Sequence, residues 1–240
     1  MIVKNRLLNS DFIIYQDEDW FKFSIDSVLL SNFVTMNLRT KKVMDLATGN
    51  APIPMLLTYR TKAQIYGIEF QKCVYDLAEQ SIIENHLEDR IQLIYGDVRE
   101  LKDFFDGDIF DVITCNPPYF KVNDKSFFND NSVKAMARHE ITLSLGDVLR
   151  CVSYLLKNGG IFAMVHRTER FVEILEMFRY YHIEPKRIRF IYPKEDMMSD
   201  LFLIEGIKNG NPGLKLLPPL VVHRNSNDYT DEVKEILNMR

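Results

Sequence analysis

Short apolar segments alternate with segments of helical periodicity along most of this 240-residue chain. We expect seven strands, over 43–46, 63–69, 91–95, 110–115, 161–166, 188–192 and 201–207. The helices between them are expected over 50–59, 71–85, 143–156 and 169–180. Asn158, Gly159 and Gly160 are expected to end the third of these helices. Strands that alternate with helices form βαβ units, which build a mostly parallel sheet.

The last two expected strands are joined only by 193–200, without a helix between them. This favours an antiparallel hairpin at one sheet edge. The predicted fold class is therefore α/β, a doubly wound, mostly parallel seven-stranded sheet with an antiparallel edge hairpin. In residues 1–40 we expect a hairpin over 12–23 and a helix over 26–36. The predicted division is an N-terminal part, 1–40, and a main domain, 41–240.

Composition excludes several classes of protein. Hydrophobic residues make up 46% of the chain and charged residues 27%, as in soluble globular proteins. No apolar run reaches the roughly 20 residues of a membrane span, and the N-terminus lacks a signal-peptide pattern. Cys73, Cys115 and Cys151 have no metal-ligand spacing, so we expect reduced, half-buried thiols and no bound metal. We expect a cytoplasmic monomer without a membrane contact.

The first motif is a turn of small residues between the first expected strand and its helix. It runs from Asp45 to Ala51, with Ala47 and Gly49 between them. Small residues let the backbone approach a ligand closely. A Gly-x-Gly-x-x-Gly pattern is absent, which argues against a diphosphate. The carboxylate of Asp45 favours a cationic ligand that carries an ammonium and a sulfonium group.

Two further acids stand where expected strands end. Glu69 ends the second strand, where an acid accepts hydrogen bonds from ribose hydroxyls in such folds. Asp97 follows the third strand and could accept a hydrogen bond from an adenine amine. An acid after a strand can also be a helix N-cap only. Three acids at the carboxyl ends of parallel strands together indicate one cofactor crevice.

The second motif, Asn116, Pro117, Pro118 and Tyr119, follows the fourth expected strand directly. A conjugated amine or amide nitrogen is a poor nucleophile, and two acceptors on its hydrogens would localise its lone pair. The Asn116 side-chain oxygen and the Pro117 carbonyl can be these acceptors, held by the rigid proline backbone. Tyr119 can stack on a flat acceptor. The structural alternative is a rigid turn with an exposed aromatic residue.

These motifs resemble class I S-adenosylmethionine-dependent methyltransferases, and within them the amino-methyltransferases that carry Asn-Pro-Pro-Tyr. The resemblance covers 42–208 and implies S-adenosylmethionine as cofactor, held by Asp45, Ala47, Gly49, Glu69, Asp97 and Asn116. Ala47 and Ala51 depart from the family pattern, in which glycines are usual at these positions.

Further segments resemble bacterial enzymes that methylate N6 of an adenine in the anticodon loop of valine tRNA. They are 23–30, 137–140, 165–170, 185–189 with 192–193, 218–222 and 229–230. The resemblance implies that Asp26 and its neighbours lie over the cofactor and acceptor pocket, so 1–40 covers the site. Phe23 is either a wall of that pocket or a core residue. Residues 120–137 are polar and aperiodic, and we expect a mobile loop placed as a lid.

A tRNA substrate needs basic contacts, because the net charge is −4. Arg138 and His139 could meet a phosphate, or could simply begin a solvated helix. A run without acids holds Lys186, Arg187, Arg189 and Lys194 with aromatic residues between them, and Arg167 precedes it. Such a run can bind a splayed RNA loop or protect a sheet edge from aggregation. The resemblance favours RNA.

The predicted function is methyl transfer from S-adenosylmethionine to the N6 amine of a tRNA adenine. Two alternatives from other classes stay open. One is N5 methylation of a protein glutamine, as in release factors, although the helical recognition domain of those enzymes is not evident ahead of the core. The other is a non-catalytic RNA-binding module, against which the intact tetrapeptide argues. Other RNA amines are possible acceptors. A DNA adenine methylase would need a longer target-recognition segment.

Overall fold

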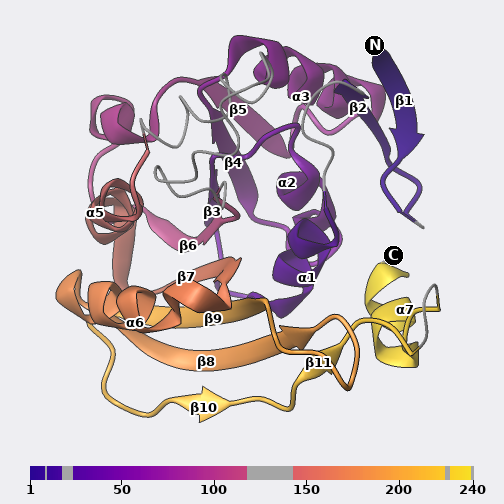
Figure 1. The fold of residues 1–240 in the computed structure, drawn as a ribbon. Helices are drawn as coiled ribbons and strands as arrows, with labels where there is room; N and C mark the ends of the chain where they lie inside the picture. The colour runs from indigo at the N-terminus through magenta and orange to yellow at the C-terminus, as the bar shows by residue number, and fades with distance from the viewer. Residues whose placement is uncertain (9, 18–23, 118–142, 225–227, 239–240) are drawn as a thin grey trace, which may run out of the picture.

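The computed structural model describes residues 1–8, 10–17, 24–117, 143–224 and 228–238 (Figure 1). The main sheet has nine strands in the order β10-β8-β9-β7-β6-β3-β4-β5, and β11 also pairs with β8. These strands are β3 (Lys42–Leu46), β4 (Gln64–Glu69), β5 (Ile91–Tyr95), β6 (Phe110–Cys115), β7 (Leu156–Arg167), β8 (Ile183–Tyr192), β9 (Leu201–Lys208), β10 (Lys215–Leu216) and β11 (Leu220–Val221). Only β9 runs antiparallel to its neighbours, β7 and β8.

The predicted doubly wound sheet and its antiparallel β8–β9 pair are therefore confirmed, but the predicted strand count of seven is wrong. The two additional strands, β10 and β11, pair parallel with β8 and cover the edge that it would otherwise expose. Each has two residues, which is too short to show an alternating pattern in the sequence.

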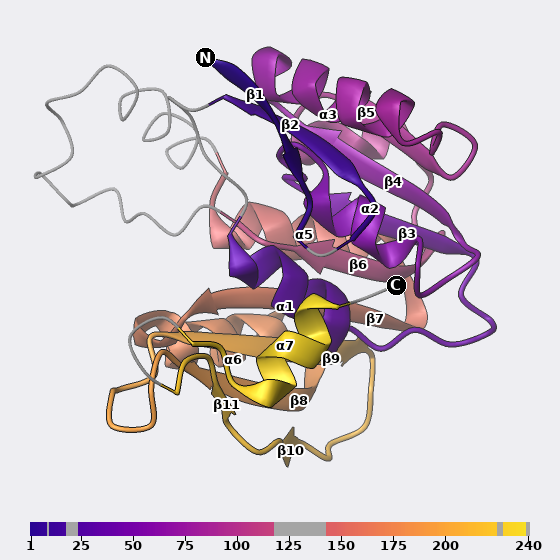
Figure 2. The same ribbon diagram turned by 90° about the vertical axis from the view of Figure 1, so that its right-hand side faces the viewer.

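Helices cover both faces of the sheet (Figures 1 and 2). One face packs against α1 (Ile25–Phe33), α2 (Pro52–Leu57), α3 (Lys72–Glu84) and α7 (Asp231–Leu237). The other packs against the 3₁₀ helix η1 (Val98–Asp103), α5 (Leu145–Leu155) and α6 (Phe171–Tyr180), which follows η3 (Thr168–Arg170). Each face has its own core of buried apolar residues, as expected when helices pack on both sides of a parallel sheet.

Helix α5 shows why one predicted boundary is wrong. Ser144 and Asp147 form a reciprocal capping box that begins the helix. The helix ends at Leu155, because Leu156 is extended and already begins β7. Asn158, Gly159 and Gly160 therefore lie inside a strand instead of ending a helix, at a register shift between β6 and β7.

The N-terminal hairpin lies earlier in the chain than predicted. Strand β1 (Ile2–Arg6) pairs antiparallel with β2 (Ile13–Asp17), so the hairpin spans 2–17 and not 12–23. Helix α1 ends at Phe33 because Val34 is extended. Residues 18–23 and the predicted loop at 120–137 fall outside the described residues.

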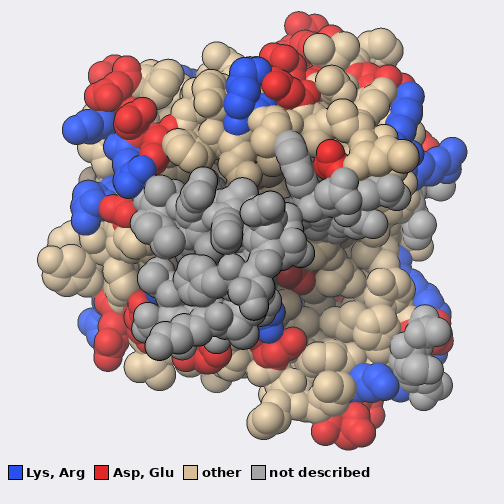
Figure 3. Space-filling view, turned by 45° about the horizontal axis from the view of Figure 1, so that its top comes forward, with Lys and Arg blue, Asp and Glu red and all other residues tan. Residues whose placement is uncertain are grey.

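The surface carries charges of both signs. On the face drawn in Figure 3, acidic and basic side chains of the described residues lie close to one another. Cys73 is exposed, Cys151 is half-buried and Cys115 is fully buried, so the prediction of half-buried thiols holds for one of the three. Within the described ranges, the helices are too short or too polar to cross a membrane.

Candidate active site

The site lies at the carboxyl ends of the three central strands. Strand order reverses between β3 and β6, and this switch point is where open α/β sheets bind ligands. In the register, Asp45 lies opposite Gly67 of β4 and opposite Thr114 of β6. Two residues beyond these neighbours come Glu69 and Asn116. Because side chains alternate along a strand, all of these residues face the α1–α2 side of the sheet.

Asp45 is a fully buried carboxyl group. Thr48 Oγ1 donates to its Oδ2 at 2.6 Å, and Thr114 Oγ1 donates to its Oδ1 at 2.6 Å. Burial raises the pKa of Asp45 to about 7; the two hydroxyl donors oppose this rise and nearby Glu69 adds to it. Asp45 thus joins β6 to the turn after β3, and its contact with a cofactor stays a prediction.

The turn after β3 is held in an unusual backbone conformation. Ala47, Gly49 and Ala51 all have positive φ, at 52°, 60° and 65°. For a non-glycine residue this conformation costs about 1–2 kcal/mol. Backbone hydrogen bonds hold the turn, including Thr48 N–H to the carbonyl of Ile68 at 2.9 Å. The alanines that depart from the family pattern therefore still adopt the left-handed turn.

Glu69 links this turn to the end of β4. It is 3% exposed. Its Oε2 accepts from Gly49 N–H at 2.9 Å, and its Oε1 accepts from Gln71 N–H at 2.8 Å. An ionised carboxylate oxygen has two lone pairs, so each atom can accept a second hydrogen bond from a ligand. The ribose contact predicted for Glu69 is compatible with these bonds and stays a prediction.

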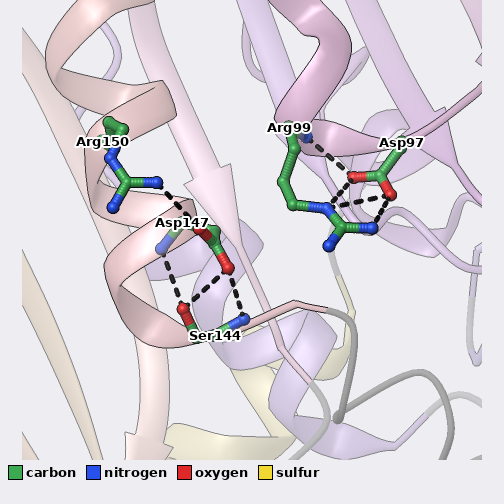
Figure 4. A network of polar contacts seen from close by, with 5 residues as sticks. All are labelled: Asp97, Arg99, Ser144, Asp147 and Arg150. Atoms are coloured by element: carbon green, nitrogen blue, oxygen red, sulfur yellow. Dashed lines mark hydrogen bonds and ion pairs between the residues drawn. The ribbon is translucent and has the colours of Figure 1, made fainter.

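Asp97 has the N-cap role that was the alternative to cofactor binding. Its carboxylate accepts from the backbone N–H of Arg99 at 2.8 Å and caps η1. It also accepts from Nε of the Arg99 side chain at 3.0 and 3.1 Å (Figure 4). Nearby in the same view, Ser144 and Asp147 cap α5 and Arg150 pairs with Asp147. The adenine contact of Asp97 stays a prediction.

Asn116 is held by the N-terminal part of the chain. Its Nδ2 donates to Ser27 Oγ at 3.0 Å, although the two residues are 89 positions apart. Ser27 is 4% exposed and lies in the first turn of α1, directly after the predicted site residue Asp26, which is 8% exposed. Pro117 is the last described residue of this segment. The predicted residues Tyr119, Arg138 and His139 lie outside the described residues.

Arg187 is engaged inside the fold. Its Nη1 donates to Thr35 Oγ1 at 2.6 Å and pairs with Glu205 at 3.3 Å. The guanidinium also lies 4.6 Å from the centre of the Phe33 ring. These contacts join β8 and β9 to the end of α1, whereas the RNA contact of Arg187 stays a prediction.

The other two predicted RNA-binding arginines differ in their surroundings. Arg189 donates to the carbonyl of Pro218 at 3.0 Å and to Glu232 at 2.6 Å, which ties β8 to the C-terminal segment. Arg167 is exposed and is the last residue of β7, at the same sheet edge as Asn116. Of the three, Arg167 is the one that is exposed, and its contact with RNA stays a prediction.

The prediction from sequence missed Ser27, Thr48 and Thr114. Thr48 lies within the small-residue turn, and Thr114 stands two positions before Asn116 and shares its face. The local pattern contains a signal for both, because a hydroxyl beside a buried acid is a natural donor. No local pattern pairs Ser27 with Asn116, since that contact depends on how α1 packs.

Comparisons with known proteins bear on the family and the fold of the chain. A family model described as a methyltransferase domain matches residues 38–205. A protein of Bacteroides thetaiotaomicron, named tRNA1(Val) (adenine(37)-N6)-methyltransferase, is 26% identical over 93% of each chain. A protein of the same name from Parabacteroides distasonis is 29% identical over 81% of this chain and 80% of its own.

Solved structures show the same fold. A predicted O-methyltransferase of Agrobacterium tumefaciens has a TM-score of 0.72 at 21% identity and covers 90% of this chain and 96% of its own. Geranyl diphosphate C-methyltransferase of Streptomyces coelicolor, solved with S-adenosyl-L-homocysteine, has a TM-score of 0.58 at 12% identity and covers 76% of each chain. At these identities the likeness is one of fold.

Proposed function

The chain belongs to the methyltransferase domain family, and from that premise we propose that it transfers a methyl group from S-adenosylmethionine to the N6 amine of an adenine in tRNA. The acceptor we propose is an adenine in the anticodon loop of valine tRNA, in line with the names of the relatives. The observation that carries the proposal is the place of Asn116, at the switch point of the sheet and hydrogen-bonded to Ser27.

The residues at the turn after β3 suit this cofactor. A Cβ added at Gly49 would meet no atom within 4 Å, so open space borders the turn. Asp45, Glu69 and Asp97 would hold the ammonium group, the ribose hydroxyls and the adenine amine. When bound, S-adenosylmethionine supplies an electrophilic methyl group on its sulfonium.

The chain itself orients the acceptor amine. The hydrogen bond to Ser27 uses the Nδ2 end of the Asn116 amide, so Oδ1 is the atom that we assign to one hydrogen of the amine. The carbonyl of Pro117 would accept the other hydrogen. These two acceptors localise the nitrogen lone pair toward the methyl group, which is catalysis by positioning and electrostatic preorganisation. Tyr119 would stack on the base.

The N-terminal part, 1–40, would cover the site. Two hydrogen bonds support this part of the proposal. Asn116 Nδ2 donates to Ser27 Oγ, and Asn50 Nδ2 donates to the carbonyl of Tyr15 at 3.1 Å. Arg167 would contact the RNA at the same edge. We further propose a monomer that works in the cytoplasm, where tRNA is modified.

Transfer of labelled methyl groups tests the function. Purified protein is incubated with tritiated S-adenosylmethionine and, in separate reactions, with unmodified valine tRNA, a glutamine-containing release factor and duplex DNA. The proposal predicts label in tRNA alone, recovered as N6-methyladenosine after digestion to nucleosides. Label in the release factor would establish glutamine-N5 methylation instead, and binding of tRNA without any transfer would indicate a non-catalytic module.

A further inference from the structure

Gln16 holds a buried hydrogen-bond donor without a partner. The residue lies in β2 and is 2% exposed. Its Nε2 makes no hydrogen bond. Among the buried side-chain nitrogen and oxygen atoms of the described residues, only Nδ1 of His223 also lacks a hydrogen-bond partner. A buried amide that makes no hydrogen bond loses the solvation it had in water without compensation. Such an atom is therefore a natural contact for a ligand.

Strand β2 is fixed beside the turn that follows β3. The side chain of Asn85, the C-cap residue of α3, accepts from Ile13 N–H at 2.8 Å and donates to the carbonyl of Ile13 at 2.6 Å. Ser81 Oγ accepts from Tyr15 N–H at 2.9 Å. Asn50, which follows Gly49 in the turn, donates to the carbonyl of Tyr15 at 3.1 Å. The residue before Gln16 thus contacts the predicted cofactor turn directly.

The side chain of Gln16 faces inward from this strand. Ile14, two positions earlier, is fully buried in the core that α1 and α2 share. Tyr15 faces the other way, and its hydroxyl donates to the partly exposed Glu84 at 3.2 Å. Because side chains alternate along a strand, Gln16 shares the face of Ile14. Its amide therefore faces the inner side of the hairpin, and the neighbouring residue Tyr15 contacts Asn50 of the turn.

The chemistry of the proposed cofactor calls for a donor at such a place. Its amino-acid end carries a carboxylate as well as an ammonium group. The side chains predicted to hold the cofactor include Asp45, Glu69 and Asp97, which can only accept hydrogen bonds when ionised. A carboxylate needs N–H or O–H groups, and the amide of Gln16 supplies two hydrogens of that kind.

We propose that Gln16 Nε2 donates a hydrogen bond to the carboxylate of the amino-acid end of S-adenosylmethionine. This inference rests on the proposed function, because it requires that the chain bind this cofactor. Gln16 is then a binding residue contributed by the N-terminal hairpin, and the hairpin forms one wall of the cofactor site.

Calorimetry with two ligands tests the assignment. S-Adenosylhomocysteine has the amino-acid end, and 5′-deoxy-5′-methylthioadenosine lacks it while keeping adenine and ribose. The variant Gln16→Met keeps an unbranched side chain of similar length and removes the donor. We expect S-adenosylhomocysteine to bind about tenfold more weakly or worse, the loss typical of one hydrogen bond to a charged group. Binding of methylthioadenosine should be unchanged.

Two further variants make the test specific. Gln92→Met makes the same substitution at an exposed position of β5 and should leave both affinities unchanged. Gln16→Asn withdraws the amide by one methylene, and it should show the same selective loss if Gln16→Met fails to fold. Undiminished binding of methylthioadenosine reports that each variant is folded.

The outcomes separate this inference from the proposed function. Unchanged binding of S-adenosylhomocysteine to a folded Gln16 variant, or an equal loss for both ligands, would overturn the role of Gln16 and leave the function standing. Failure of the unaltered protein to bind either ligand would overturn the proposed function itself.

Discussion

Asp45 is a strongly perturbed carboxyl group of the proposed site, because it is fully buried and lies near Glu69. Its pKa lies above the unfolded value of 3.8, at about 7. The folded chain therefore binds a proton more tightly than the unfolded chain does between these two values. The stability that this group contributes is full below pH 4 and is lost as pH rises toward 7.

Replacing Asp45 by asparagine should remove this pH dependence. The amide keeps the shape, and Thr48 and Thr114 can each donate or accept, so little change in stability is expected near pH 4. At pH 7.5 the variant should be more stable than the unaltered protein, by up to about 4 kcal/mol if the full rise in pKa counts. Urea unfolding across this pH range measures the difference.

Asp111 is the matched control for that experiment. Burial, which alone would raise the pKa of Asp111, is outweighed by hydrogen bonds from Lys157 and from two backbone amides, so its pKa is lowered. Asp111→Asn should therefore be less stable than the unaltered protein at pH 4 and above, and this deficit should shrink as pH falls below 4, the opposite sign to Asp45→Asn. If the two variants behave alike, burial is not the cause of the shift at Asp45.

Asn116 carries the chemistry in the proposed mechanism. Asn116→Ala removes an acceptor for the amine and the hydrogen bond to Ser27. We expect turnover to fall by about a hundredfold or more, while the affinity for S-adenosylhomocysteine stays within a few-fold. Single-turnover kinetics and calorimetry measure the two quantities. Near-normal turnover would show that another group orients the amine.

At the scale of elements, α1 connects the sheet edge at β8 and β9 with the catalytic segment. Its carboxyl end is held by Arg60, which donates to the carbonyls of Ser31 and Val34, and by the Arg187–Glu205 pair. Its first turn meets Asn116 through Ser27. A helix fixed at one end can hold a side chain in place at the other.

Removal of the Ser27 hydroxyl should slow transfer without weakening cofactor binding. Ser27→Ala loses the hydrogen bond that orients the Asn116 amide, and we expect kcat to fall by about tenfold. Ser31→Ala is the matched control, since Ser31 is also buried, lies one turn further along α1, and its hydroxyl donates to the backbone carbonyl of Ser27. Partial recovery in Ser27→Thr would assign the effect to the hydroxyl. A parallel fall for both alanine variants would mean that α1 had merely been destabilised.

Hydrophobic periodicity predicts the bounds of a strand well where the apolar residues of that strand alone mark its start and its end. The bounds of β5 and β6 are those expected from the sequence. Strands β10 and β11 form because they pair with β8. Strand β7 continues through Asn158, Gly159 and Gly160 because it pairs with β6. Local sequence carries no information on such partners. The same holds within the site for the pairing of Ser27 with Asn116.

At the scale of the whole molecule, the RNA substrate must find a local binding surface, because the net charge is −4. Arg187 and Arg189 make hydrogen bonds within the fold, Arg187 to the residues that follow α1 and Arg189 to the C-terminal segment. Removing either is therefore expected to lower stability as well as any RNA affinity. Arg167 is exposed at the end of β7, so its replacement is the more specific test of RNA binding.

Arg167→Ala should weaken tRNA binding and lower the salt slope of the binding constant by about one unit, the effect of losing one phosphate contact. Arg179→Ala is the control, because Arg179 lies in the last turn of α6, at the opposite edge of the sheet. Filter binding at several salt concentrations measures both. An unaltered slope for Arg167→Ala would place the RNA contacts elsewhere.

The proposed reaction is methylation of N6 of an adenine in tRNA, and it requires Asn116. Mass spectrometry of nucleosides from the valine tRNA of cells that lack the gene tests it most directly. We predict that N6-methyladenosine is missing from that tRNA, returns with the unaltered gene and does not return with Asn116→Ala. Retention of the methylated nucleoside in the deletion strain, or its full return with Asn116→Ala, would contradict the proposed function.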